Sequence, residues 1–164
     1  MKRTQLTRKT PLKRTEFVRK PAKKKRKVKS PRKKAKDAAW DACSRYIRLR
    51  DALRTTGSPD TCVCVTCGKT KPTFGKGCIH AGHWLGGRKG KNLFDERGIF
   101  SQCAGCNLFG AGQQIPYTAF MMERYSYDVI DALVLQGNTP YKHSMDELEE
   151  LRLHYIAKYE ELTR

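Results

Sequence analysis

After residue 36, hydrophobic side chains recur at helical spacing. The segment DAAWDACSRYIRLRDALR, residues 37–54, brings one stripe of side chains onto a common helical face. The members of this stripe are Trp40, Cys43, Ile47, Arg50 and Leu53. The turn-forming sequence TTGSPD follows at residues 55–60. The pattern therefore predicts a helix over residues 37–54.

Two more helical patterns lie near the C-terminal end. Residues 117–135 carry apolar side chains at helical spacing and are followed by the turn sequence GNTP, which predicts a second helix, either continuous or broken. In residues 143–162, Ser144 and Glu147 have the spacing of a capping box, in which side chains satisfy the first backbone N–H groups of a helix. This predicts a third helix, so residues 117–164 form the C-terminal helical region.

Residues 61–115 show a different pattern, rich in cysteine and glycine and without a long periodic segment. The pieces TCVCV at 61–65 and CIHAGHW at 78–84 are compatible with short β-strands. A region with so many loops needs a cross-link between its segments, such as a disulfide or a bound metal ion, to hold it together. The expected fold class is therefore α+β, with a cross-linked core and flanking helices.

Composition divides the chain in two. Of its 164 residues, 38% are hydrophobic, and no apolar run approaches the roughly 18 residues of a membrane span. The net charge is +18, but residues 1–36 hold 18 of the 34 Lys and Arg residues and one of the 16 acidic residues. We therefore expect a basic tail over residues 1–36, one domain over residues 37–164, and a soluble, intracellular protein without a membrane partner.

The tail has the composition of a segment that is disordered in isolation. Its charges repel one another, and Pro11, Pro21 and Pro31 oppose helix formation. A polyanion is the natural partner, because neutralising phosphates releases counterions, although a purely solubilising arm is the alternative. The candidate nucleic-acid contacts are Lys23, Lys24, Lys25, Arg26 and Lys27. They lie in PAKKKRKV, which is similar to a nuclear-localisation signal, but DNA binding explains this run equally well.

Seven cysteines in an intracellular chain favour metal binding over disulfides. The two C-x2-C pairs, CVTC and CAGC, can each present two thiolates to one tetrahedral zinc ion. The predicted structural Zn²⁺ ligands are Cys64, Cys67, Cys103 and Cys106. Cys62 is a weaker competitor for Cys64, whereas Cys43 and Cys78 are interpreted as small buried hydrophobic residues.

The residues between the two pairs suggest a strand, a loop, a second strand and a helix beginning near Cys106, a ββα unit around zinc. The sequence here resembles the phage NinG/Rap recombination proteins, a branch of the HNH (ββα-metal) endonucleases, over residues 46–164. The matching pieces are YIRLRDA at 46–52, CVTCGK at 64–69, AGHW at 81–84, FDERGIFSQCAGCN at 94–107 and GQQIPY at 112–117. The resemblance implies a structure-selective DNA endonuclease that acts on Holliday junctions and D-loops in phage recombination. It would act in the cytoplasm of a bacterial host, near the nucleoid.

Phosphodiester hydrolysis needs an activated water and a cation that neutralises charge on the phosphate. His83, at the position that matches the first HNH histidine, is the candidate general base. Asn107, where the HNH pattern has its last metal ligand, and His80 are candidate ligands of a catalytic Mg²⁺ or Mn²⁺. On a regular strand His80 and His83 face opposite sides, whereas a bulge at Gly82 would return both to one face.

The chain also departs from the HNH pattern. Gly98 stands where the middle Asn is expected; either Asn92 substitutes for it, or backbone contacts alone hold the loop. Phe109 replaces an expected polar or basic residue. The glycine-rich loop offers its basic side chains as further DNA contacts, namely Arg88, Lys89 and Lys91. A DNA-binding protein without catalysis and an RNA-binding zinc protein are the rival hypotheses, and paired cuts across a symmetric junction would suit a homodimer.

Overall fold

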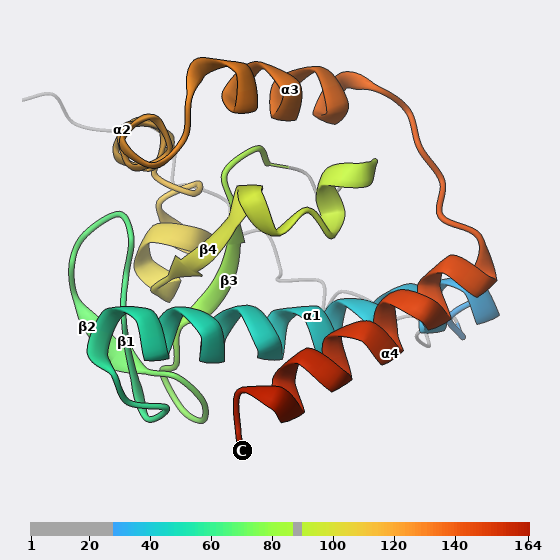
Figure 1. The fold of residues 1–164 in the computed structure, drawn as a ribbon, viewed down its shortest axis with the longest axis horizontal. Coiled ribbons are helices and arrows are strands. Elements are labelled where there is room, and N and C mark those ends of the chain that lie inside the picture. Colours follow the sequence, from blue (N-terminus) through green and yellow to red (C-terminus); the bar gives the residue numbers. More distant parts are fainter. Residues whose placement is uncertain (1–27, 87–89) are drawn as a thin grey trace, which may run out of the picture.

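A computed structural model describes residues 28–86 and 90–164, which form a mixed α+β fold with two small sheets. The long helix α1 (Pro31–Thr56) runs along one side of the molecule, and α4 (Met145–Glu161) lies against it, although the two are far apart in sequence (Figure 1). The strands pack on α1, and α2 (Gln114–Arg124) and α3 (Tyr127–Asn138) lie beyond them. The expected fold class, α+β, is confirmed.

Helix α1 begins earlier than predicted, at Pro31 rather than at residue 37. The Ser30 hydroxyl accepts a hydrogen bond from the Lys33 amide at 3.3 Å and caps the helix. Pro31 occupies the first helical turn, where its missing N–H would have no helical partner, so it favours the helix start instead of opposing it. The boundary expected after residue 36 therefore lies within α1. Lys23, Lys24, Lys25, Arg26 and Lys27 lie outside the described residues.

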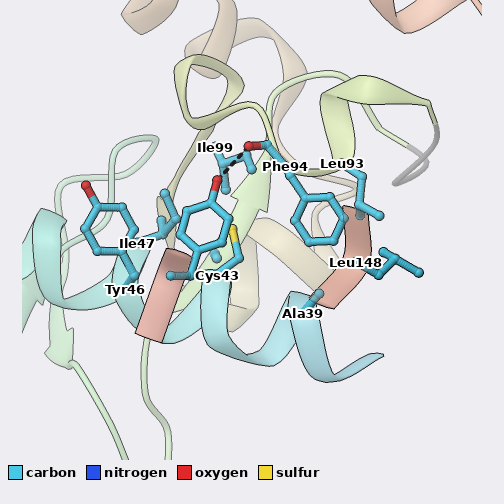
Figure 2. Packing of buried hydrophobic residues seen from close by; sticks show 10 residues of the cluster. Ala39, Cys43, Tyr46, Ile47, Leu93, Phe94, Ile99 and Leu148 are labelled. Carbon is cyan, nitrogen blue, oxygen red and sulfur yellow. Dashed lines mark hydrogen bonds between the residues drawn. The ribbon is translucent and has the colours of Figure 1, made fainter. Parts of the chain in front are cut away.

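The predicted stripe of α1 is buried in part: Cys43, Ile47 and Arg50 are buried, whereas Trp40 and Leu53 are only half-buried. Cys43 and Ile47 are fully buried, and they pack with side chains of α4 and of the segment before the last strand (Figure 2). The hydroxyl of Tyr155 donates a 2.8 Å hydrogen bond to the Phe94 carbonyl, the dashed line in Figure 2. This bond fixes the segment around Phe94 against α4.

The motif YIRLRDA supplies a buried ion pair that joins α1 to the sheet. Arg50, 5% exposed, lies 2.8 Å from the Asp51 carboxylate and donates to the Ile99 carbonyl at 2.8 Å. Asp51 accepts from the Ser101 amide at 2.8 Å. Burial raises the pKa of Asp51, while the charge of Arg50 opposes that rise. The charges of Arg50 and Asp51 are thus neutralised within the fold.

The strands of the described residues form two antiparallel pairs. β1 (Thr61–Val63) pairs with β2 (Thr70–Pro72), and β3 (His80–His83) pairs with β4 (Ile99–Gln102). Two short helical turns, η1 (Lys91–Leu93) and η2 (Glu96–Gly98), lie between β3 and β4. The helix expected near Cys106 is the single turn η3 (Gly105–Phe109).

The C-terminal helices follow the predicted pattern. The segment predicted as a continuous or broken helix is two helices, α2 and α3, which are separated at Tyr125 and Ser126. The capping box of Ser144 and Glu147 is present at the start of α4 and is confirmed. Among the described residues, no helix combines the length and the apolar character that crossing a bilayer requires.

Candidate functional site

The four predicted metal ligands come together. The sulfur atoms of Cys64, Cys67, Cys103 and Cys106 all lie within 4.8 Å of one another. The Cys67 and Cys103 sulfurs are 3.8 Å apart, and a tetrahedral zinc site with Zn–S bonds of about 2.3 Å has sulfur–sulfur edges of about 3.8 Å. The four thiols could therefore hold a metal ion such as zinc.

Two tight turns position these sulfurs. After β1, the Gly68 amide donates to the Cys64 carbonyl at 2.9 Å, and Gly68 has a φ of 69°, which glycine adopts without strain. After β4, the amides of Cys106 and Asn107 donate to the Cys103 carbonyl at 3.1 and 2.9 Å. Backbone hydrogen bonds within each C-x2-C segment thus form the turn that brings its two sulfur atoms together. The strands β2, β3 and β4 lie between the two segments in the sequence.

The surroundings of the cluster favour a thiolate at one sulfur. Burial opposes ionisation of Cys64, but the Thr66 hydroxyl and the Cys103 amide, 3.2 Å away, bond to its sulfur and lower its pKa to about 6. Desolvation and the neighbouring sulfurs raise the pKa of Cys106 to about 12. A cation among the sulfurs would reverse the second effect, because it stabilises every thiolate.

The remaining cysteines do not join the cluster. Cys62, the weaker competitor, is buried beside the Thr55 hydroxyl, and burial raises its pKa. Cys43 is a core residue as predicted, and burial raises its pKa to about 12. Cys78 is only half-buried, and its sulfur accepts from Arg48 at 3.6 Å, so its interpretation as a buried hydrophobic residue is wrong.

His83 is held in a defined orientation at the end of β3. Its imidazole stacks on Trp40 of α1, with ring centroids 4.7 Å apart and an interplanar angle of 27°. Its Nε2 lies 3.1 Å from the Leu93 carbonyl oxygen. A carbonyl only accepts, so Nε2 carries the hydrogen, and in the neutral ring Nδ1 is the basic nitrogen.

His80 and His83 are on opposite faces of the strand. The β3–β4 pairing runs without interruption from His80 opposite Gln102 to His83 opposite Ile99. Gly82 pairs with Phe100 inside this ladder, so the bulge that would have placed both histidines on one face is absent. A side chain at Gly82 would meet the Gln102 side chain at 2.2 Å, which explains the glycine by close packing.

The loop that holds His83 is anchored by Asn92. Asn92, 9% exposed, donates to the Leu133 carbonyl at 2.9 Å and accepts from the Gln136 amide at 2.7 Å, both on α3. The next residue, Leu93, provides the carbonyl that accepts from His83. The loop is therefore held by a side chain from η1, although Gly98 stands where the HNH pattern has its Asn.

The other predicted residues are less tightly grouped. Asn107 lies on η3 directly after Cys106, whereas His83 is at the end of β3 that pairs with Ile99. Lys91 is exposed and lies over the Tyr141 ring, 4.9 Å from its centroid. Arg88 and Lys89 lie outside the described residues. Phe109 is 87% exposed at the end of η3.

Sequence reasoning missed a polar face of α1 beside the histidines. Trp40, Ser44 and Arg48 line a cavity of about 140 Å³ together with Cys78 and His80. These three α1 positions are spaced by four residues, so they share one helical face. The hydrophobic pattern places Trp40 in the core stripe, but Ser44 and Arg48 follow it at intervals of four residues, and this spacing is the signal that identifies the second face.

Comparison with known proteins gives one consistent result. A family model described as Bacteriophage Lambda NinG protein matches residues 1–164. The curated proteins named Protein ninG from Escherichia phage lambda and Escherichia phage 933W are each 26% identical to this chain over 125 residues, which is 76% of its length. The Salmonella phage P22 protein of the same name is equally similar, again 26% identical.

These alignments cover 55 to 56% of the phage proteins, so the chain spans about half the length of the curated relatives it matches. No solved structure matches the chain.

Proposed function

The chain belongs to the NinG family of phage recombination proteins, and from this premise we propose that it is a structure-selective DNA endonuclease that cleaves branched intermediates such as Holliday junctions and D-loops. The orientation of His83 carries this proposal, because an imidazole fixed through Nε2 presents a defined basic nitrogen. A freely rotating surface histidine would have no such constraint. The arrangement is suited to a general base.

In this proposal His83 takes a proton from the water that attacks the scissile phosphorus. The hydrogen bond from Nε2 to the Leu93 carbonyl stabilises the imidazolium that forms when Nδ1 accepts the proton. Stacking on Trp40 limits rotation of the ring about its Cβ bond. The protein thus supplies a base that is oriented before DNA binds.

The zinc cluster has a structural role in the proposal. It joins the turn after β1 to the turn after β4, and β4 is the partner strand of β3, which carries His83. In the proposal, β3, β4 and the single turn η3, beside the four-cysteine cluster, take the place of the ββα unit of HNH enzymes. Four thiolates complete the tetrahedral shell, so this ion would have no open position for a substrate.

The described residues do not form a convincing site for a catalytic Mg²⁺ or Mn²⁺. In residues 28–86 and 90–164, the cysteine cluster is the only group of three or more His, Cys, Asp or Glu side chains close enough to share an ion. His80 lines the same cavity as the cationic Arg48, which disfavours a metal ion there. Asn107 offers one amide oxygen. We therefore assign no catalytic step to this cation. Whether cleavage requires it is tested in the cleavage assay described below.

DNA is the partner that this function requires, in the cytoplasm of the bacterial host. The basic tail and the lysine at position 91 would supply phosphate contacts that do not depend on sequence. A homodimer would allow paired cuts across a symmetric junction, and light scattering on the purified protein measures this directly.

The proposal predicts that the purified full chain nicks a synthetic four-way junction and leaves a linear duplex of the same sequence intact. We expect cleavage in Mg²⁺ or Mn²⁺, measured on denaturing gels with each strand labelled in turn. Parallel reactions with EDTA establish whether a divalent cation is required. Equal cleavage of junction and duplex would contradict the structure selectivity, and junction binding without any nicking would contradict the enzymatic proposal.

A DNA-binding protein that has lost catalysis is the second candidate. Two residues favour it: Gly98 supplies no side chain to position the loop of the base, and the cationic Arg48 beside His80 disfavours a catalytic cation there. The junction assay separates the two candidates, because this protein would bind branched DNA without nicking it. A preference for structured RNA over junction DNA would instead favour an RNA-binding zinc protein.

Asn92 provides a test of the positioning mechanism. Substituting Asn92→Ala removes both hydrogen bonds to α3 and releases the loop that carries the Leu93 carbonyl. We expect the turnover number for junction cleavage to fall roughly 10- to 100-fold while the KM changes little, because small displacements of a catalytic group have effects of this size. Asn138→Ala, an exposed position on α3, is the matched control. An Asn92→Ala variant with normal turnover would show that the loop holds His83 without this anchor.

A further inference from the structure

Arg48 is a half-buried cation on the helical face of α1 that adjoins β3. Its Nε donates to the Ser44 carbonyl at 3.1 Å, and Nη1 lies 3.5 Å from the Thr73 carbonyl and 3.6 Å from the Cys78 sulfur. The guanidinium lies over the Phe74 ring, 4.7 Å from its centroid. These contacts hold the side chain in one place, but none of these partners in the described part of the chain is a carboxylate.

Arg50, on the same helix, has carboxylate partners of the kind that Arg48 does not have among the described residues. Arg50 forms ion pairs with Asp51 and Glu96 at 2.8 and 3.6 Å. Within residues 28–86 and 90–164, no carboxylate is within 4.0 Å of Arg48, and no acceptor bonds to its Nη2. A partly desolvated guanidinium favours an anionic partner, because the fork of N–H groups matches phosphate and carboxylate oxygens.

Arg48 faces a cavity with the right size and chemistry for such a partner. The cavity has a volume of about 140 Å³, roughly that of four or five water molecules, and a phosphate group has five heavy atoms. Besides Arg48, the cavity is lined by Ser44, His80 and Trp40. We propose that this cavity binds a backbone phosphate of the DNA substrate and that Arg48 is its principal ligand.

This inference rests on the proposed function and adds a substrate-binding site to it. Trp40 both lines the cavity and stacks on His83, so this one side chain connects the proposed phosphate site with the candidate base. The site also gives His80 a different role from the metal ligand expected from the sequence. Its imidazole, on the opposite strand face from His83, would bind the phosphate alongside Arg48.

The decisive measurement is the binding of a fluorescent four-way junction to the full chain across a series of salt concentrations. We expect Arg48→Ala to weaken binding about 10-fold and to reduce the slope of log K against log salt by about 1, because one phosphate contact is lost. Arg48→Lys keeps the charge and should restore the slope but not the full affinity. Arg45→Ala, an exposed arginine of α1 in the groove shared with α4, is the matched control and should resemble the wild type.

A second probe does not depend on DNA. The Cys78 sulfur contacts Arg48 and lines the cavity, so inorganic phosphate bound there should slow alkylation of Cys78 by iodoacetamide. Peptide mass spectrometry gives the rate with and without phosphate in each variant. We expect protection in the wild type and in Arg45→Ala, and none in Arg48→Ala.

The outcomes separate the cavity from the proposed function. If Arg48→Ala binds the junction like Arg45→Ala while the wild type still nicks it, the cavity assignment is overturned and the endonuclease proposal stands. If the wild type does not bind or cleave DNA but phosphate protects Cys78 only when Arg48 is present, the anion site stands and the endonuclease proposal fails. An effect of Arg48→Ala confined to structured RNA would overturn the assignment to DNA.

Discussion

Removing the metal from the cysteine cluster is expected to unfold the middle of the chain. Structural zinc sites contribute about 10–16 kcal/mol of apparent binding free energy, which exceeds the stability of most small domains. Around the four ligands the local core is small, with Ala52, Cys62 and Ile79 as its other buried members. Without the ion, the four sulfur atoms, which lie within 4.8 Å of one another, are no longer bonded through a common metal. Few apolar contacts then remain to hold the two turns together.

The measurement is thermal unfolding by circular dichroism, with zinc content determined on the same sample. We expect about one zinc per chain, a large loss of thermal stability in the presence of a strong zinc chelator, and recovery on adding Zn²⁺. Cys103→Ser should lower both the zinc content and the stability. Cys78→Ser, outside the cluster, is the matched control and should retain zinc. Unchanged melting after complete removal of zinc would contradict the structural assignment.

The affinity of the cluster for zinc should also decrease as the pH is lowered. The ligands bind as thiolates, so protons compete with the ion at every ligand. Despite the burial of Cys64, hydrogen bonds from Thr66 and Cys103 lower its pKa to about 6, so this sulfur favours the thiolate that zinc requires. Zinc release on acidification therefore reflects protonation of the cysteine thiolates.

Periodicity and spacing predicted the features that depend on local sequence. The buried stripe of α1, the capping box at Ser144 and the four-cysteine cluster all follow from residues at fixed spacings. Sequence alone predicts the start of α1 too late, because the net charge and Pro31 disfavour a helix before residue 37. The Ser30 cap and the position of Pro31 in the first turn reverse that inference.

The details of the histidine site could not be predicted in this way, because they depend on contacts between distant segments. Asn92 was one of two alternatives for holding the loop, and only its bonds to Leu133 and Gln136 of α3 distinguish them. The side of the strand on which His80 lies was open until the pairing with Gln102 fixed it. Arg48 lies in the segment YIRLRDA, but the lack of a carboxylate partner for it within residues 28–86 and 90–164 follows from packing and not from that segment.

Substituting His83→Ala is expected to reduce junction cleavage by about 10²- to 10⁴-fold, the usual contribution of a general base. Junction affinity should change little, because the imidazole acts on water and not as a phosphate ligand. Single-turnover cleavage of the four-way junction measures the chemical step, and anisotropy measures binding separately. His154→Ala, an exposed histidine on α4, is the matched control and should cleave at the wild-type rate.

The pH dependence of cleavage distinguishes a base from a residue that only shapes the site. Only the neutral imidazole accepts a proton, so the wild-type rate should rise with pH as His83 loses its proton and then level off. In His83→Ala this rise should disappear, and added imidazole should partly restore activity by entering the space beside Trp40. A variant that keeps the wild-type pH profile at a reduced rate would show that His83 acts through packing. The hydrogen bond between Nε2 and Leu93 would then serve the fold of the loop and not the chemistry.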